Sequence, residues 1–363
     1  MKRIIAIALT ICMMLAIFAG CSSGSGNNAT APAGSTAVPA QNAAADNAET
    51  IVIRVNSAIK SSTVEETANG LGILQFVDKV RERTDGKYEI KLFMDSQLGG
   101  SSEQVVGGLQ SGAFEMCTLA LGSFGEYTNA FMPMNFPYMF SSEEVIHKVV
   151  DGEVGQRMRD DCIADTGIRP LAFTELGFRH MTNSKRVIKS PADVKGLKIR
   201  TMNDPYQISA MESLGAAVTP TAYSELFTAL QQGVVDGQEN PCQNIWTEKF
   251  YEVQDYMTLT KHTYTLQMLG IAESYFQSLP VDVQEILLEE GRNCEIRNRE
   301  ELEAIDNAQL EELRKVMEVT ELTQEEFDAF REAASTSWGP AKEAMGEEYF
   351  NLLMSEVEKY EKE

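Results

Sequence analysis

The sequence has few of the residues that build catalytic or metal centres. Only three of its 363 residues are histidines, and His147, His180 and His262 are widely scattered. There is no H-E-x-x-H motif, no Cys/His zinc spacing and no P-loop, and residues from 51 onward contain no G-x-S-x-G nucleophile motif. These absences argue against the common classes of hydrolase, metalloenzyme and nucleotide-binding enzyme.

Basic residues are also scarce, with 31 Lys and Arg against 54 Asp and Glu, which gives a net charge of −23. Phosphate backbones and anionic membranes are bound by basic surfaces, so neither nucleic acid nor a charged bilayer is an expected partner. The 43% of hydrophobic and 23% of charged residues are typical of a folded globular protein. The chain length favours about two domains or lobes.

Long apolar runs are absent except at the N-terminus, where residues 4–18 follow a basic pair at positions 2 and 3. This pattern is typical of an export signal, because a membrane-spanning helix needs about 20 apolar residues. The run ends in Phe18-Ala-Gly-Cys21, which resembles the lipobox of bacterial lipoproteins, although Phe18 replaces the usual Leu. The resemblance implies a lipoprotein signal peptide over 1–21 and lipidation of Cys21. An ordinary cleaved signal with an incidental cysteine is the alternative.

Residues 22–50 consist mainly of Ser, Gly, Asn and Ala and carry almost no charge. Such a segment cannot bury enough apolar surface to offset its ordering entropy, so we expect a flexible linker. A lipid anchor followed by a linker suits a receptor held at the outer face of a membrane.

Six cysteines are present, but Cys12 lies in the signal and Cys21 is the anchor candidate. The remaining four, Cys117, Cys162, Cys242 and Cys294, could form disulfides in an exported protein. Their wide spacing favours the other interpretation, in which they are free thiols buried as small hydrophobic residues.

Strands and helices alternate at the start of the mature chain. The pattern predicts strands over 51–55, 88–93 and 114–119, with helices over 64–83 and 102–110 between them. Gly86 and Gly112 mark the ends of the two helices. This alternation favours an α/β lobe with a largely parallel sheet.

The same alternation begins again near residue 190. Ser190-Pro-Ala-Asp193 is a helix-start signal, with Ser as N-cap, Pro at the first position and an acid at the third. We expect strands over 197–201 and 216–219 and helices from Asp204 to Gly215 and from 222 to 232, the last capped by Thr221. A second α/β lobe follows from this pattern.

From Pro280 onward the chain is strongly acidic and helical in character. An acidic interaction tail is one interpretation, and a pair of long helices with a solvated outer face is the other. Apolar residues recur at helical spacing, which favours the helices. The residues expected to point inward are Leu287, Ile296, Leu302 and Leu310.

A basic cluster stands out between residues 177 and 206. Within it, Arg200 lies at the end of a predicted strand, just before a helix start, where ligand crevices form in open α/β sheets. The planar guanidinium matches a carboxylate bidentately, although a structural or solvated arginine is the alternative. Asn56 occupies the corresponding position after the first strand. Asp236 and Glu239 form a close pair of carboxylates, which a glycosidase could use as acid and base, but capping chemistry around a turn at Asp236-Gly237 is favoured.

Several motifs together resemble the DctP-type solute receptors of TRAP (tripartite ATP-independent periplasmic) transporters, over residues 51–350. The motifs are Gly196-Leu-Lys-Ile-Arg200, Gly215-Ala-Ala-Val-Thr-Pro220, Tyr223-Ser-Glu-Leu226, Val235-Asp-Gly-Gln-Glu-Asn-Pro241, Ser96-Gln-Leu-Gly99 and Asn135-Phe-Pro-Tyr138. The resemblance implies a two-lobed periplasmic-binding-protein clamshell of the α/β class, with a long lobe-spanning C-terminal helix. The first lobe would comprise 51–176 and 266–304, and the second 177–265 and 305–363.

The resemblance also implies a ligand site. Its expected residues are Arg200, Asn240, Arg179, Asn203, Tyr223 and Asn56. Arg200, in the K-[IL]-R motif, would hold the ligand carboxylate, with Asn240 beside it and Arg179 assisting. Ala120 stands where the sialic-acid receptors carry Glu, which argues against sialic acid, and Cys242 after Q-E-N-P is unusual.

These implications predict an extracytoplasmic receptor without cofactor, metal or catalytic activity. It would capture a small organic acid anion, such as a C4-dicarboxylate, keto acid or sugar acid. It would then deliver the anion to a small DctQ-like and a large DctM-like membrane subunit. A sensory receptor that docks on a chemoreceptor or kinase is the second hypothesis, and an exported enzyme acting on acidic sugars is the third.

Overall fold

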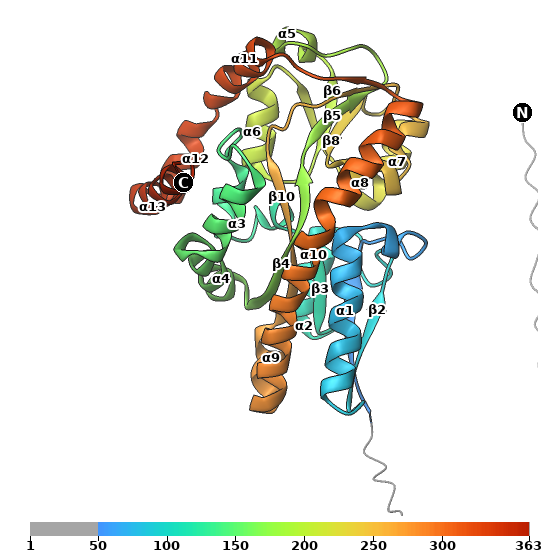
Figure 1. Ribbon diagram of the computed structural model, residues 1–363, viewed down its shortest axis with the longest axis vertical. Coiled ribbons are helices and arrows are strands. Elements are labelled where there is room, and N and C mark those ends of the chain that lie inside the picture. The colour runs from blue at the N-terminus through green and yellow to red at the C-terminus, as the bar shows by residue number, and fades with distance from the viewer. Residues whose placement is uncertain (1–49, 363) are drawn as a thin grey trace, which may run out of the picture. The chain divides into compact units, whose positions relative to one another are not determined.

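The computed structural model describes residues 50–362. The predicted signal peptide, the lipidation of Cys21 and nearly all of the predicted linker therefore lie outside the described residues. None of the helices formed by residues 50–362 combines the length and the apolar character needed to cross a bilayer. The described chain is a mixed α/β structure built on two sheets (Figure 1).

The first sheet has five strands in the order β2-β1-β3-β10-β4. The strands are β1 (Ile51–Ser57), β2 (Tyr88–Phe93), β3 (Met116–Ala120), β4 (Ile168–Phe178) and β10 (Tyr264–Ala272). The three predicted strands of this lobe are confirmed, and β1 runs parallel to β2 and β3. The expectation of a largely parallel sheet is only partly right, because β10 is antiparallel to both of its neighbours.

The second sheet has six strands in the order β11-β9-β5-β8-β6-β7. They are β5 (His180–Asn183), β6 (Lys198–Thr201), β7 (Ala217–Pro220), β8 (Gly237–Asn240), β9 (Tyr256–Thr258) and β11 (Glu318–Thr320). We call the parts built on the five-stranded and six-stranded sheets the first lobe and the second lobe. The expected turn at Asp236-Gly237 is wrong for Gly237, which begins strand β8.

The two sheets are joined by the long strands β4 and β10 (Figure 1). Strand β4 ends at Phe178 and β5 begins at His180, so the chain passes from one sheet to the other at Arg179. The backbone amide of Arg179 donates to the Thr263 carbonyl at 2.9 Å, which continues the pairing with the segment before β10.

Helices of the first lobe are α1 (Ala68–Arg83), α2 (Ser102–Ser111), α3 (Glu143–Asp151) and α4 (Glu153–Thr166). A reciprocal capping box of Ser101 and Gln104 begins α2. Gly112, in the left-handed conformation with φ 73°, ends it as the sequence predicts. The apolar faces of α2, α3 and α4 contribute to the main core of this lobe.

Helices of the second lobe are α5 (Pro191–Val194), α6 (Pro205–Ser213), α7 (Leu226–Gln231) and α8 (Cys242–Thr247). The helix start predicted at Ser190 is confirmed, with a capping box of Ser190 and Asp193, and Asp204 caps α6. Thr221 is not a helix cap, because its hydroxyl contacts the Thr219 carbonyl and α7 begins later, after a 3₁₀ turn at Tyr223–Glu225.

The C-terminal part consists of α9 (Glu273–Ser278), α10 (Val281–Val316), α11 (Gln324–Ser335), α12 (Trp338–Met345) and α13 (Glu347–Tyr360). The 36-residue α10 contacts α1 and β4 in the first lobe and α8 and β11 in the second. Leu287 and Leu302 are buried as expected, and Leu310 is half-buried. The prediction for Ile296 is wrong, because its side chain is 43% exposed on the outer face.

The end of the chain contacts both lobes. Helix α11 packs against α5 and α6, whereas α13 packs against α3 and α4 (Figure 1). Leu353 and Val357 of α13 belong to the main core of the first lobe. The lobe boundaries expected from the sequence, which assign residues 305–363 to the second lobe, remain a proposal.

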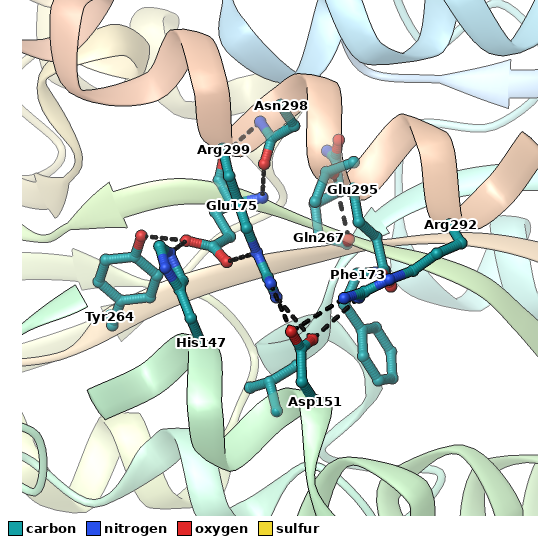
Figure 2. A network of polar contacts seen from close by, with 12 residues as sticks. His147, Asp151, Phe173, Glu175, Tyr264, Gln267, Arg292, Glu295, Asn298 and Arg299 are labelled. Carbon is teal, nitrogen blue, oxygen red and sulfur yellow. Dashed lines mark hydrogen bonds and ion pairs between the residues drawn. The ribbon is translucent and has the colours of Figure 1, made fainter. Parts of the chain in front are cut away.

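A network of charged side chains fastens α10 to the strand that joins the sheets (Figure 2). The fully buried Glu175 of β4 accepts hydrogen bonds from Arg299 at 2.7 Å and from the Tyr264 hydroxyl at 2.5 Å. Asn298 bonds both the backbone amide and the carbonyl of Glu175. Arg299 also contacts Asp151 at the end of α3, so one face of α10 is bonded to both β4 and α3.

Candidate functional site

Three adjoining cavities lie between the lobes, with volumes of about 200, 70 and 40 Å³. We call them the outer, central and inner cavities. The outer and central cavities share Thr118 and Leu119 of β3 with Arg200 and Met202 of the second lobe. The central and inner cavities share Leu176 and residues of α8 and β10. Tyr223 lines all three, so the cavities form one pocket lined by both sheets.

Arg200, near the end of β6, is 1% exposed. Its Nε and Nη2 donate to the Thr221 carbonyl at 2.9 and 2.6 Å, which fixes the guanidinium plane. The remaining nitrogen, Nη1, is buried and has no hydrogen-bond partner. Burial lowers the pKa of Arg200 to about 10, partly offset by the charge of Glu239, so the group stays cationic at neutral pH. The site therefore presents a buried cationic donor without a partner.

Arg179 is 2% exposed and is already paired with Glu239. Its Nε and Nη2 contact the Glu239 carboxylate, and Nη1 donates to the Thr265 hydroxyl at 2.9 Å. Burial would raise the pKa of Glu239, but the charge of Arg179 and the hydrogen bond from His262 outweigh it and lower that pKa to about 2. Arg179 lines the central cavity with its charge balanced by the protein itself.

Asp236 and Glu239, the close pair of carboxylates in the sequence, both have partners within the protein. Glu239 forms an ion pair with Arg179, and Asp236 accepts a hydrogen bond from the backbone amide of Lys198 at 3.0 Å. The two carboxylates serve an ion pair and backbone capping, and the favoured interpretation for Asp236 is confirmed.

The three asparagines predicted for the site also line the pocket. Asn240 is 4% exposed in the central cavity, where its Oδ1 accepts from Arg179 at 3.2 Å. Asn56 lines the outer cavity, but both ends of its amide bond the backbone at Leu98 and Gly99. Asn203 is exposed at the wall of the outer cavity. The structure brings all six predicted residues together, and their roles toward a ligand remain predictions.

Tyr223 connects the basic and the amide-rich ends of the pocket. Its ring centroid lies 6.0 Å from the guanidinium carbon of Arg200, and its hydroxyl accepts from Asn244 Nδ2 at 2.7 Å. Burial raises the pKa of the Tyr223 hydroxyl far above its usual value, so the group remains a neutral hydrogen-bonding partner.

Other lining residues were not singled out from the sequence. They include Lys60, Thr63, Gln243, Asn244, Glu248 and Gln267. Gln243 and Asn244 directly follow the Q-E-N-P-C segment, so their position beside a recognised motif was an available signal. Within residues 50–362, no group of three or more His, Cys, Asp or Glu side chains is arranged to hold a metal ion.

Contacts cross between the lobes around the pocket. Ser224 donates to the Gly100 carbonyl at 3.2 Å, and Lys60 lies 3.3 Å from Glu248. Deeper in the protein, Asn135 donates to the buried carboxylate of Asp204 at 2.7 Å. These contacts describe lobes that are closed on each other.

Comparisons with known proteins agree with this geometry. The model of the family "Bacterial extracellular solute-binding protein, family 7", also called DctP, matches residues 60–344. A solute-binding protein of Verminephrobacter eiseniae is 36% identical over 73% of this chain and 78% of its own. The 2,3-diketo-L-gulonate-binding periplasmic protein of Escherichia coli is 32% identical over 64% and 70%.

Solved structures share the fold. A sugar acid binding protein of Advenella mimigardefordensis, in complex with galactonate, matches with a TM-score of 0.81 and 29% identity over 86% of this chain and 99% of its own. A TRAP periplasmic solute binding protein of Polaromonas, bound to D-erythronate, matches with a TM-score of 0.79 and 30% identity over 84% and 98%. The protein is thus a two-lobed clamshell of the DctP family of TRAP solute-binding proteins.

Proposed function

We propose that this protein is the extracytoplasmic receptor of a TRAP transporter and captures a small organic acid anion through Arg200. The observation that carries the proposal is the buried, unpartnered Nη1 of Arg200 at the wall of the pocket. A buried cation with a donor nitrogen left without an acceptor costs free energy, and a ligand carboxylate would supply both the charge and the acceptor. With Nε and one N–H of Nη2 used by Thr221, the end of the guanidinium remains for bidentate contact.

The neighbouring groups support an anion in the central cavity. Asn240 lies next to Arg179, which adds a second guanidinium whose charge is balanced by Glu239. Relatives that share the fold are described with D-erythronate and galactonate, which are both carboxylates. The ligand belongs to the organic acids, which include C4-dicarboxylates, keto acids and sugar acids.

Binding would be coupled to closure of the lobes. A ligand shifts an open–closed equilibrium by its differential affinity for the closed form, and a carboxylate held between β6 and the first lobe contacts both sides only when they are closed. The closed receptor would deliver the acid to the small DctQ-like and large DctM-like membrane subunits. Lipidation at Cys21 and the linker over 22–50 would keep it at the membrane surface, and no reaction is catalysed.

A thermal-shift screen of the purified protein against organic and sugar acids tests the proposal. An acid present at 100 times its dissociation constant adds about 2.7 kcal/mol to the free energy of unfolding. A rise with one class of carboxylates is expected. The absence of any shift across the carboxylates would refute the assignment of Arg200 to an organic acid.

A further inference from the structure

The inner cavity contains an unusual concentration of unpartnered polar atoms. Thr63 Oγ1, Gln243 Oε1 and Asn244 Oδ1 are buried and have no hydrogen-bond partner, and all three residues line this cavity. Gln243 is 1% exposed, and its other amide atom already donates to the Leu176 carbonyl at 3.0 Å. Each unsatisfied buried group costs about 1–3 kcal/mol, so the cavity is built for a partner that donates hydrogen bonds.

The chemistry of these atoms selects the donor. The amide oxygens of Gln243 and Asn244 accept hydrogen bonds only, and the Thr63 hydroxyl both donates and accepts. Hydroxyl groups satisfy such a set, whereas a carboxylate has no proton to offer. The volume of about 40 Å³ is enough for more than one water-sized group.

The charges around the inner cavity also disfavour a second carboxylate. Among the described residues that line it, Lys60 is the one cation, and it is paired with Glu248 at 3.3 Å. A second carboxylate placed here would face the carboxylate of Glu248 and would have to displace it from Lys60. Like charges at close range in a partly desolvated site repel strongly.

The two ends of the pocket lie on either side of Tyr223. Arg200 approaches the ring of this tyrosine, and Asn244 donates to its hydroxyl, so one tyrosine side chain separates the guanidinium from the unpartnered amide oxygen. A ligand carboxylate on Arg200 and a hydroxylated chain passing along Tyr223 would occupy both ends.

We propose that the receptor selects hydroxylated monocarboxylic acids long enough to reach from Arg200 past Tyr223 into the inner cavity, with the carboxylate on Arg200 and the distal hydroxyls donating to Asn244 and Gln243. The inference rests on the function proposed above and adds discrimination against dicarboxylates of the same length. Asn244 and Glu248 are then the residues that determine specificity. The first accepts a terminal hydroxyl, and the second rejects a terminal carboxylate.

Calorimetric titration of the purified protein with three acids tests this assignment. Galactonate and galactarate differ in a terminal hydroxymethyl group or carboxylate, and erythronate is a shorter hydroxy acid. Galactonate is expected to bind about tenfold more tightly than either. Erythronate loses the hydrogen bonds of the distal hydroxyls, each worth about two- to tenfold in affinity, and galactarate adds the repulsion between its second carboxylate and Glu248. Equal or tighter binding of galactarate would overturn the proposal.

Two variants separate this proposal from a general loss of binding. Asn244→Ala is expected to reduce the ratio of galactonate to erythronate affinity about fivefold to tenfold. Glu248→Gln is expected to raise galactarate affinity relative to galactonate by about tenfold. Asn351→Ala, on the exposed face of α13, is the matched control, for which both ratios stay at the wild-type value.

The outcomes distinguish a failure of the specificity assigned to the inner cavity from a failure of the function proposed for Arg200. If Asn244→Ala weakens galactonate and erythronate by the same factor, the inner cavity holds water and the specificity assignment is overturned. If instead no carboxylate binds the wild-type protein, the function proposed for Arg200 fails first. Thermal unfolding of each unliganded variant shows whether it is folded, and the three-acid comparison on the wild type stands without any variant.

Discussion

Replacement of Arg200 is the sharpest test of how this protein holds an anion. Its guanidinium is 1% exposed and anchored by two bonds to Thr221, with Nη1 left for the ligand. Removing one partner of a buried, hydrogen-bonded charge pair costs about 2–5 kcal/mol, so Arg200→Ala is expected to weaken binding by roughly 30-fold to several thousandfold. Arg200→Lys keeps the charge but loses the planar fork, and we expect an intermediate loss.

The assay is isothermal titration of wild-type and variant proteins with an acid identified by the thermal-shift screen. Lys198→Ala is the matched control, because Lys198 lies on the same strand but its side chain is exposed. Since the pKa of Arg200 is about 10, the affinity of the wild type should be constant between pH 6 and 8 and should fall as the pH rises through 10. An affinity of Arg200→Ala within threefold of the wild type would refute the reasoning.

Three further predictions concern stability, measured by urea unfolding. Glu239→Gln removes the partner of the buried Arg179 and is expected to cost about 3–5 kcal/mol; a loss below 1 kcal/mol would contradict the pairing. Burial raises the pKa of Asp204 from 3.8 to about 6, so the folded state binds the proton of this carboxyl more tightly than the unfolded chain does. The contribution of Asp204 to the free energy of unfolding therefore falls by roughly 3 kcal/mol as the pH rises from about 4 to 6. Asp204→Asn should flatten that slope, and an unchanged slope would exclude Asp204 as its source. Leu302→Ala is expected to cost about 2–5 kcal/mol and Ile296→Ala less than about 0.5 kcal/mol, because the two α10 side chains are 2% and 43% exposed; similar losses would show that exposure is not the deciding factor.

Local signals in the sequence predicted much of the fold. Strands β1 and β2, the end of α2 at Gly112 and the helix start at Ser190 follow from hydrophobic patterns and side-chain chemistry within a few residues. Strands β4 and β10 were not predicted, since nearly every residue in them is buried on both faces and no alternation marks them. Their antiparallel pairing depends on how the chain returns from the second lobe, which no short segment encodes.

The error at Ile296 has a similar origin. On α10 the buried face carries the polar residues Glu295 and Asn298, which bond β4, so hydrophobic spacing alone assigns the wrong side of the helix. Arg200 could be recognised because a strand end and a basic cluster coincide there. For Asn244 the sequence offers only its place after the Q-E-N-P-C segment, because its contact with Tyr223 depends on a separate 3₁₀ turn that brings the tyrosine to it.

The cysteines have a practical consequence for following the lobes in motion. Cys117, Cys162, Cys242 and Cys294 are buried free thiols, as the sequence favoured, and burial raises the pKa of each; for Cys117 it reaches about 12. Thiolates are the species that react with maleimides, so these four positions resist labelling in the folded state. A pair of cysteines introduced at exposed sites, one on each lobe, could therefore carry fluorescent dyes without removing any of these four thiols.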